Sequence, residues 1–294
     1  MGTMQSAPRL PQSGSPAAAV KRLSISEISG KGAGLPNRYI LHATEGWGKT
    51  SLGAQTPKPI FIETGGETGL ETLIDAGRLP EVPHFPAIQS WEALLGVIET
   101  LTVEDHPYRT AILDTLNGAE ALCHQFICAR DFSNEWGNKG FGSYNKGYEV
   151  ALPEWSKFLS ALDRLRTERK MTIFLLCHTK IKPFKNPEGP DYDRYQPDIH
   201  EKTWGISHRW ADCVLFGNFE VTLTAVQTNE KTGASRGKGT GSAYRLMFTE
   251  RHAAYDAKNR LGLAPEIEMG NSAVEAWTNF MAAVKAGKGV QSNG

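Results

Sequence analysis

Short apolar runs and longer amphipathic segments alternate along most of this chain. The apolar runs have the length of strands buried in a parallel sheet. The segments between them repeat apolar residues at helical spacing, as Leu152, Trp155, Leu159 and Leu162 do. This alternation predicts an α/β fold with a mostly parallel central sheet flanked by helices. The predicted strands are 39–43, 59–62, 109–114, 171–177 and 213–216, and the predicted helices are 69–76, 91–100, 115–130, 152–168, 201–211 and 272–286.

The rhythm changes after Glu220, where strand and turn patterns replace the helices. Phe219–Gln227 and Ala243–Thr249 predict an antiparallel hairpin, and Ala253–Tyr255 is expected to add a third strand. Further upstream, a Pro-rich polar stretch over 181–200 is predicted to be a loop. We therefore expect the parallel sheet to carry a late antiparallel β extension.

Composition and charge narrow the class of protein. One domain is expected over 21–286, preceded by a disordered tail over 1–20 and followed by a flexible tail over 287–294. Lys+Arg and Asp+Glu both number 32, so local basic groups would have to hold any nucleic acid. The cysteines lack metal-binding spacing and no apolar run is long enough to span a membrane, which favours a cytoplasmic protein.

The stretch from Tyr39 to Leu52 carries the most specific chemical signal. An apolar strand leads into a glycine-bearing turn and then into Gly48-Lys49-Thr50 at the start of a predicted helix. This pattern is typical of a P-loop, whose backbone N–H groups hold the phosphates of ATP while its lysine reaches the terminal phosphates and its threonine binds Mg²⁺. Ala43 stands where the strict pattern has its first glycine. The residues expected to bind the nucleotide are Gly46, Trp47, Gly48, Lys49, Thr50 and Ser51.

Acids and a histidine follow other predicted strands, and they are expected at the same edge of the sheet. Asp114 is expected to hold Mg²⁺ together with Thr50. Hydrolysis also needs a group that orients water, and Glu63 and Glu67 are both candidates. His178 is expected to contact the γ-phosphate. The ordinary structural alternatives are an aspartate that caps the next helix and a histidine that caps a carbonyl group.

Three loops carry cations, and two of them, 131–148 and 181–200, also carry aromatic residues, a combination that suits single-stranded nucleic acid. Cations would hold the phosphates and aromatic rings would stack on the bases. In the loop over 131–148, however, most of the rings are expected to pack on the core. The candidate DNA-binding residues are Lys139, Lys146, Lys182, Lys185, Arg194, Arg236 and Lys238.

A late basic run, Lys258-Asn259-Arg260, allows two interpretations. One is a solvated basic turn. The other is an arginine finger, in which cations of one subunit reach the γ-phosphate bound by a neighbour.

Together, these motifs resemble those of phage-encoded ATP-binding proteins of the AAA-domain type with a RecA-type core, which include the ATP-dependent single-strand annealing proteins. The resemblance covers residues 23–269. Its most specific parts are the run Tyr192–Pro197 and the run Ala257–Leu263. The P-loop, Leu113-Asp114 and Cys177-His178-Thr179-Lys180 also contribute.

The resemblance implies a RecA-like P-loop ATPase that uses ATP and Mg²⁺ and acts on single-stranded DNA in phage recombination or strand annealing. The acidic run of the family matches Gly66–Leu70 and thereby points to Glu67, although two extra residues near Gly65 keep Glu63 in competition. In related ring-forming proteins such a Lys-Asn-Arg run completes the ATP site across a subunit interface. Lys258 and Arg260 would then act in trans.

The expected assembly is a homo-oligomeric ring or filament, and a single-strand DNA-binding protein is a further candidate partner. The expected location is the cytoplasm, which would be that of the host for a phage protein. Two alternatives stay open. One is a helicase-like or loader motor of the same fold, and the other is a nucleotide-gated DNA-binding protein with little turnover.

Overall fold

The computed structural model describes residues 24–29, 32, 34–228 and 235–291, and for 26, 221–228, 235–243 and 288–291 it describes the backbone alone. The chain divides into two compact units, Met1–Gly34 and Leu35–Gly294. The described part of the first unit contains one 3-10 turn, η1 (Ile25–Glu27). All other elements described belong to the second unit.

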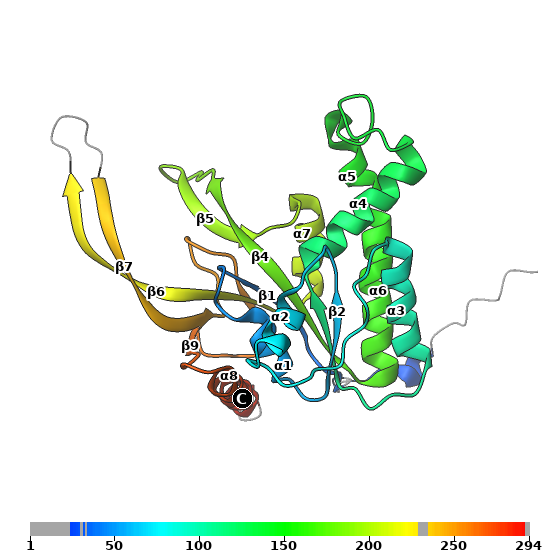
Figure 1. Ribbon diagram of the computed structural model, residues 1–294, viewed down its shortest axis with the longest axis horizontal. Coiled ribbons are helices and arrows are strands. Elements are labelled where there is room, and N and C mark those ends of the chain that lie inside the picture. The colour runs from blue at the N-terminus through cyan, green and yellow to red at the C-terminus, as the bar shows by residue number, and fades with distance from the viewer. Residues whose placement is uncertain (1–23, 30–31, 33, 229–234, 292–294) are drawn as a thin grey trace, which may run out of the picture. The chain divides into compact units, whose positions relative to one another are not determined.

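Five parallel strands form the centre of the second unit, in the order β2-β3-β4-β1-β6 (Figure 1). Each of them coincides with a strand predicted from an apolar run, so the predicted fold class is confirmed. Their bounds are β1 Arg38–Ala43, β2 Pro59–Glu63, β3 Thr110–Asp114, β4 Thr172–Phe184 and β6 Cys213–Thr228.

Antiparallel strands extend this sheet on one side. β7 (Ser235–Phe248) pairs with β6, β9 (Glu266–Glu268) pairs with β7, and β8 (Lys258–Asn259) pairs with the start of β6. The predicted hairpin is therefore present. The predicted third strand at Ala253–Tyr255 is wrong, because this segment forms only isolated bridges through Tyr255 and the sheet uses β9 instead.

The predicted loop over 181–200 is also wrong, because β4 continues to Phe184 and pairs there with β5 (Tyr192–Pro197). This second half of β4 extends past its pairing with β1, which ends at His178. Its outer part therefore lies at a sheet edge, where polar residues and Pro183 are tolerated. That polar composition is what made the segment resemble a loop.

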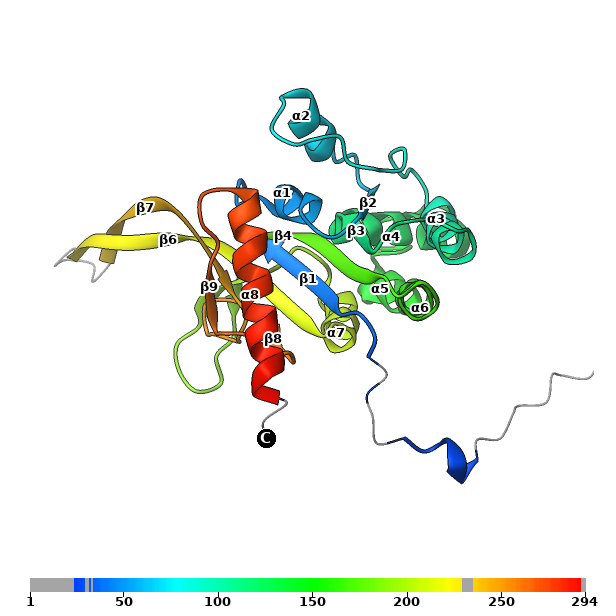
Figure 2. The ribbon, with the colours of Figure 1, turned by 90° about the horizontal axis from the view of Figure 1, so that it is seen from below.

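Helices cover both faces of the parallel strands (Figure 2). The side chain of Ile40 packs in the apolar cluster of one face, and those of Tyr39 and Leu41 pack in the cluster of the other, as the period of two of a strand requires. On the first face lie α3 (Trp91–Val103), α4 (Leu116–Phe132), α6 (Leu152–Arg169) and α7 (Glu201–Trp210), with the short α5 (Lys146–Val150) beyond α4. On the second face lie α1 (Lys49–Ala54), α2 (Gly69–Asp75) and α8 (Ala273–Gln291). Helix α8 thus continues past residue 286, where its end is predicted.

Trp47 fastens the turn after β1 to the neighbouring strands. Its side chain is 2% exposed, and its Nε1 donates hydrogen bonds to the carbonyl oxygens of Asn218 (3.2 Å) and Leu246 (3.0 Å). Gly217 leaves room for the indole, because a Cβ at this position would lie 2.6 Å from ring carbons of Trp47 and 2.8 Å from the Cβ of Ala43. The position of the turn therefore depends on the absence of a side chain in β6.

We predict that Gly217→Ala displaces Trp47 and destabilises the protein by about 1–3 kcal/mol, the usual cost of overpacking a well-filled site. Urea unfolding followed by circular dichroism measures this. Gly96→Ala is the matched control, because a Cβ there meets nothing within 4 Å in the interior of α3, and it should stabilise by up to about 1 kcal/mol. An unchanged urea midpoint for Gly217→Ala would contradict the prediction.

Candidate nucleotide site

The carboxyl ends of the parallel strands meet at one edge of the sheet, where open α/β sheets bind their ligands. Ala43 at the end of β1 lies opposite His178 of β4, and Glu63 at the end of β2 lies opposite Asp114 of β3. A cavity of about 380 Å³ opens at this edge. It is lined by Gly46, Gly48, Lys49, Thr50, Ser51, Glu67, Leu73, Arg78, Asp114, His178 and Arg245.

The turn over 46–48 has the backbone of a phosphate-binding loop. Gly46 and Gly48 have φ values of 72° and 101°, which residues with a Cβ rarely adopt, and α1 starts at Lys49. The Nζ of Lys49 donates a hydrogen bond to the Ala43 carbonyl oxygen (3.3 Å), and burial lowers the pKa of this lysine. Trp47 does not line the cavity, because its side chain points into the core, so only its backbone is available to a phosphate.

Thr50 and Asp114 are in direct contact. The Thr50 hydroxyl donates a hydrogen bond to Oδ2 of Asp114 at 2.7 Å, and burial raises the pKa of the Asp114 carboxyl group. Within the described part of the chain, no group of three or more His, Cys, Asp or Glu side chains could hold a metal ion. One hydroxyl and one carboxylate suit Mg²⁺, which keeps several waters and binds phosphate oxygens alongside one or two protein ligands.

The structure distinguishes the two glutamates that follow β2. Glu67 lines the cavity, and its Oε1 lies 2.8 Å from Nε2 of His178. Glu63 is 2% exposed, does not line the cavity, and has an Oε1 without a hydrogen-bond partner among the described residues. Burial, together with the nearby Asp114, raises the pKa of Glu63. Only Glu67 can therefore meet a water molecule in the cavity as it stands.

The backbone of His178 is fixed by a residue that was not among the predicted site residues. The His178 N–H donates a hydrogen bond to Oδ1 of Asn117 in α4 (3.2 Å). Two arginines of the cavity, Arg78 and Arg245, are likewise absent from the predicted set. Arg245 belongs to β7, about 200 residues from the P-loop, and only the strand order brings it there. No local sequence pattern marks such a residue.

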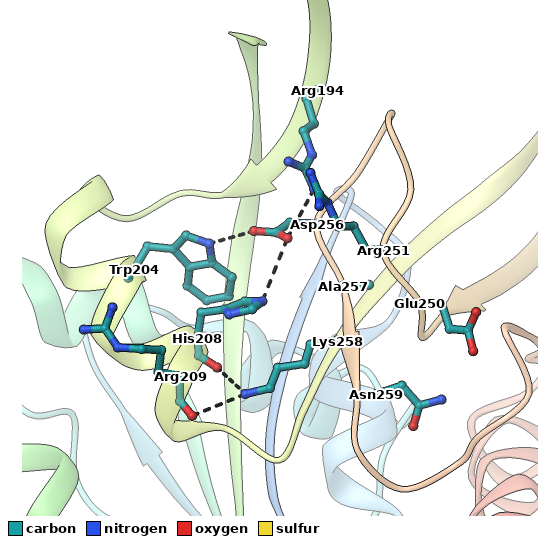
Figure 3. Close-up of a pocket in the computed structure, with 11 residues that line it drawn as sticks. Arg194, Trp204, His208, Arg209, Glu250, Arg251, Asp256, Ala257, Lys258 and Asn259 are labelled. Atoms are coloured by element: carbon teal, nitrogen blue, oxygen red, sulfur yellow. Dashed lines mark hydrogen bonds and ion pairs between the residues drawn. The ribbon is translucent and has the colours of Figure 1, made fainter. Parts of the chain in front are cut away.

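Lys258 and Arg260 lie outside this cavity. The Nζ of Lys258 donates hydrogen bonds to the carbonyl oxygens of His208 (2.6 Å) and Arg209 (3.3 Å) at the end of α7 (Figure 3). It also donates one to the Ala211 carbonyl oxygen (2.6 Å). Burial, with Arg260 nearby, lowers the pKa of Lys258 to about 8. Lys258 thus caps α7 within its own subunit, beside a second cavity of about 830 Å³.

Most of the candidate DNA-binding lysines are at the surface, whereas Arg194 is not. Lys139 and Lys146 are exposed, Lys182 is half-buried, and the exposed Lys185 forms an ion pair with Asp191 (2.7 Å).

Arg194 requires a correction. Its side chain is 7% exposed, and its Nη2 donates a hydrogen bond to Oδ1 of Asp256 at 3.3 Å (Figure 3). The same Nη2 donates one to the Tyr255 carbonyl oxygen (3.0 Å), so the side chain is not available to DNA. Arg236 and Lys238 belong to β7, but their side chains lie outside the described part of the structure.

The rings of the segment over 131–148 divide into two groups. Phe141 is buried, and Tyr148 stacks on His200 with ring centroids 3.9 Å apart. Trp136 and Tyr144 are 49% and 100% exposed. These two rings are therefore available for contacts with bases.

His42 connects the P-loop strand to β4 and to the segment before β8. The ring is completely buried, with Nδ1 2.9 Å from the Thr179 hydroxyl and Nε2 2.7 Å from the Asp256 carbonyl oxygen. Burial lowers the pKa of His42 to about 4. Lys49 and Arg194 add to this lowering, while Asp256 opposes it. The neutral imidazole is therefore part of the folded structure.

The fold and the site together define a class. A P-loop directly follows β1, an acid in contact with the P-loop threonine ends β3, and β4 lies between these two strands. This arrangement is that of a P-loop NTPase with a RecA-type core, as the sequence motifs predict.

A family model described as an AAA domain matches residues 35–261, which is most of the chain. The chain therefore belongs to this AAA-domain family and is, in general terms, a P-loop ATPase.

Other comparisons add little. A search of the curated proteins gives no match. Among solved structures, the crystal structure of the RadB recombinase matches with a TM-score of 0.43 and 14% identity, over 82% of this chain and 90% of that chain. A match this distant carries no argument about function. None of the helices in the described ranges is long and apolar enough to cross a membrane.

We predict that His42 makes the stability of the protein fall as the pH is lowered. Because the pKa of His42 is about 4 in the folded protein and about 6.5 in an unfolded chain, unfolding takes up a proton below pH 6.5. The contribution of His42 to the free energy of unfolding is fully present above about pH 6.5 and is lost as the pH falls towards 4. The free energy of unfolding should be about 2 kcal/mol lower at pH 5 for this reason.

Urea unfolding at pH 7.5 and pH 5 tests this. The free energy of unfolding of His42→Asn should fall less between the two pH values than that of the wild type. His252→Asn, at an exposed position, controls for the loss of a histidine. Equal losses in the wild type and His42→Asn would show that His42 is not responsible.

Proposed function

We propose that this protein is an Mg²⁺-dependent ATPase that acts on single-stranded DNA in homologous recombination or strand annealing, as in the phage proteins its motifs resemble. The observation that carries the hydrolytic part is the contact between Glu67 and His178 in the cavity lined by the P-loop lysine. This contact places Glu67, the candidate base, beside His178, the candidate sensor of the γ-phosphate.

The geometry suggests a division of roles within the cavity. Lys49 and the backbone N–H groups of 46–50 would hold the β- and γ-phosphates. Thr50 and Asp114 would hold Mg²⁺, which neutralises phosphate charge when bound. Glu67 would orient a water molecule and accept its proton while the water oxygen bonds to the γ-phosphorus and the bond to ADP breaks. His178 would contact the γ-phosphate.

The continuity of β4 supports a link from hydrolysis to DNA. His178 lies where β4 leaves the parallel sheet and continues into the β4–β5 hairpin, which carries Lys182 and Lys185. In Figure 1 this hairpin, the β6–β7 hairpin and α5 all extend towards the upper side of the view. Lys185 of the β4–β5 hairpin and Lys146 of α5 are exposed and suit the phosphates of single-stranded DNA. The exposed rings of Trp136 and Tyr144, in the segment before α5, suit its bases.

Action on the ATP of a neighbouring subunit is proposed for the Lys258–Arg260 segment, but the two basic residues would have different roles. Arg260 immediately follows β8 and is exposed. Lys258 already binds three carbonyl groups of its own subunit, so it would serve to hold the segment in place. We therefore expect Arg260 to be the group that reaches a neighbouring ATP site in a ring or filament. A single-strand DNA-binding protein is proposed as a separate partner, on the basis of the motif resemblance alone.

We predict that Glu67→Gln lowers kcat by roughly 10²- to 10⁴-fold while ATP still binds, since only the proton acceptor is lost. Glu63→Gln, which alters a carboxylate outside the cavity, should keep kcat within a few-fold. Phosphate release with and without single-stranded DNA and binding of a fluorescent ATP analogue provide the measurements. Full ATPase activity in Lys49→Ala would overturn the proposal, and the reverse ranking of the glutamates would assign the role to Glu63.

We predict that Lys49→Ala and Arg260→Ala are each inactive alone but regain ATPase activity when mixed. An Arg260→Ala subunit keeps an intact P-loop, and a Lys49→Ala neighbour supplies the missing arginine. Random assembly restores about a quarter of the interfaces. Phosphate release and the particle mass, each with single-stranded DNA present, are the measurements. A mixed assembly without activity would rule out action in trans.

A further inference from the structure

We infer that Arg245 binds the phosphates of the nucleotide from within the same subunit and so ties them to the base of the β6–β7 hairpin. This inference rests on the proposed nucleotide site and adds a residue to it. Arg245 is half-buried and lines the P-loop cavity together with Lys49 and Thr50. It is therefore a third cation there, beside Lys49 and Arg78.

The guanidinium of Arg245 lies directly over the P-loop. A Cβ at Gly48 would be 3.1 Å from Nη1 of Arg245, and the same Nη1 donates a hydrogen bond to the Trp47 carbonyl oxygen at 3.4 Å. The cation is thus beside the turn whose backbone N–H groups would hold phosphate. The φ of 101° at Gly48 and this close contact together favour glycine at that position.

The bonds of Arg245 leave its charge without a bonded carboxylate. Nε and Nη2 donate to the Gly270 carbonyl oxygen (3.2 and 3.0 Å), and Nη2 also donates to that of Ser272 (3.0 Å). Across the described ranges, no carboxylate forms an ion pair with Arg245. The carboxylate of Glu275 accepts the N–H groups of Asn271 and Ser272, which lower its pKa, and the nearby Arg245 lowers it further without a bond between the two side chains.

These contacts fix the orientation of the guanidinium while leaving an edge for a ligand. The 3.4 Å bond of Nη1 is the longest of the set, so a phosphate oxygen can replace it at small cost. The N–H groups of Nη1 remain for a phosphate, and a charge-assisted hydrogen bond to a phosphate oxygen is stronger than the bond to a neutral carbonyl oxygen that it would replace. The bonds from Nε and Nη2 hold the group in place during this exchange.

The position of Arg245 in β7 gives the contact a consequence. Arg245 lies opposite Phe219 of β6, at the base of the long hairpin that extends from the sheet in Figures 1 and 2. Its carbonyl oxygen accepts the Met269 N–H (2.9 Å). Arg245 is therefore also bonded to the segment between β9 and α8. Phosphate bound to Arg245 would therefore set the base of the hairpin relative to the P-loop.

The test compares Arg245→Gln, Arg245→Lys and the control Arg251→Ala, an exposed arginine outside the P-loop cavity. A fluorescent ATP analogue with Mg²⁺ is titrated at low and high salt. We expect Arg245→Gln to bind roughly 10- to 100-fold more weakly, with a smaller salt dependence, because a charge-assisted contact is lost. Arg245→Lys should fall between it and the wild type, and Arg251→Ala should match the wild type.

A purely structural role predicts a different result. If Arg245 only holds the turn at 270–272, Arg245→Gln will lower the urea midpoint, yet the folded fraction will bind the analogue with wild-type affinity and salt dependence. That outcome overturns the inference. If Arg245→Gln does not fold, the salt dependence of Arg245→Lys decides. Lys49→Ala identifies the other failure, because a wild type that binds no better than this variant removes the nucleotide site itself, and the Arg245 inference with it.

Discussion

The pairing of β1 with its two neighbours sets the distances in the candidate site. Ala43, the last residue of β1, lies opposite His178 on one side and Gly217 on the other. A shift of one residue in either pairing would turn each side chain of the shifted strand to the opposite face. His178 would then leave the cavity, and a residue with a side chain would meet Trp47. The strand register therefore decides which side chains face the cavity.

The P-loop is also held from parts of the chain that are distant in sequence. Trp47 bonds to the backbones of β6 and β7, and Arg245 of β7 bonds back to the Trp47 carbonyl oxygen. The side chain of Trp47 and its carbonyl group thus connect one turn to the same strand pair. A change in the base of the β6–β7 hairpin cannot occur without moving the turn that would bind phosphate.

The sequence was sufficient for the parts of the site that depend on local pattern. The parallel strands, the P-loop at 46–51 and the strand-end Asp114 follow from apolar runs and motif spacing. Local pattern could not separate Glu63 from Glu67, because both follow the same strand. Only the fold buries Glu63 and exposes Glu67 to the cavity. Arg245 had no local pattern at all, since strand order alone brings it to the P-loop.

Two wrong predictions, for the outer part of β4 and for Arg194, have the same physical cause. The polar residues of β4 beyond His178 looked like a loop because an edge hairpin does not need two apolar faces. Arg194 looked like a surface cation because a buried arginine is uncommon, but Asp256 and the Tyr255 carbonyl group bind its Nη2 inside the protein. In both cases, composition described the side chains correctly, and long-range pairing decided where they lie.

The charges of the cavity indicate why phosphate binding and folding should be linked. Burial lowers the pKa of Lys49 and raises that of Asp114, so each charged form costs free energy in the folded protein. A phosphate beside Lys49 and Arg245 would offset part of this cost, as would Mg²⁺ beside Asp114. A ligand that binds only the folded protein stabilises it. The charged groups that make the bare site costly are therefore those through which a Mg²⁺-bound nucleotide would stabilise the P-loop, β3 and the base of the hairpin together.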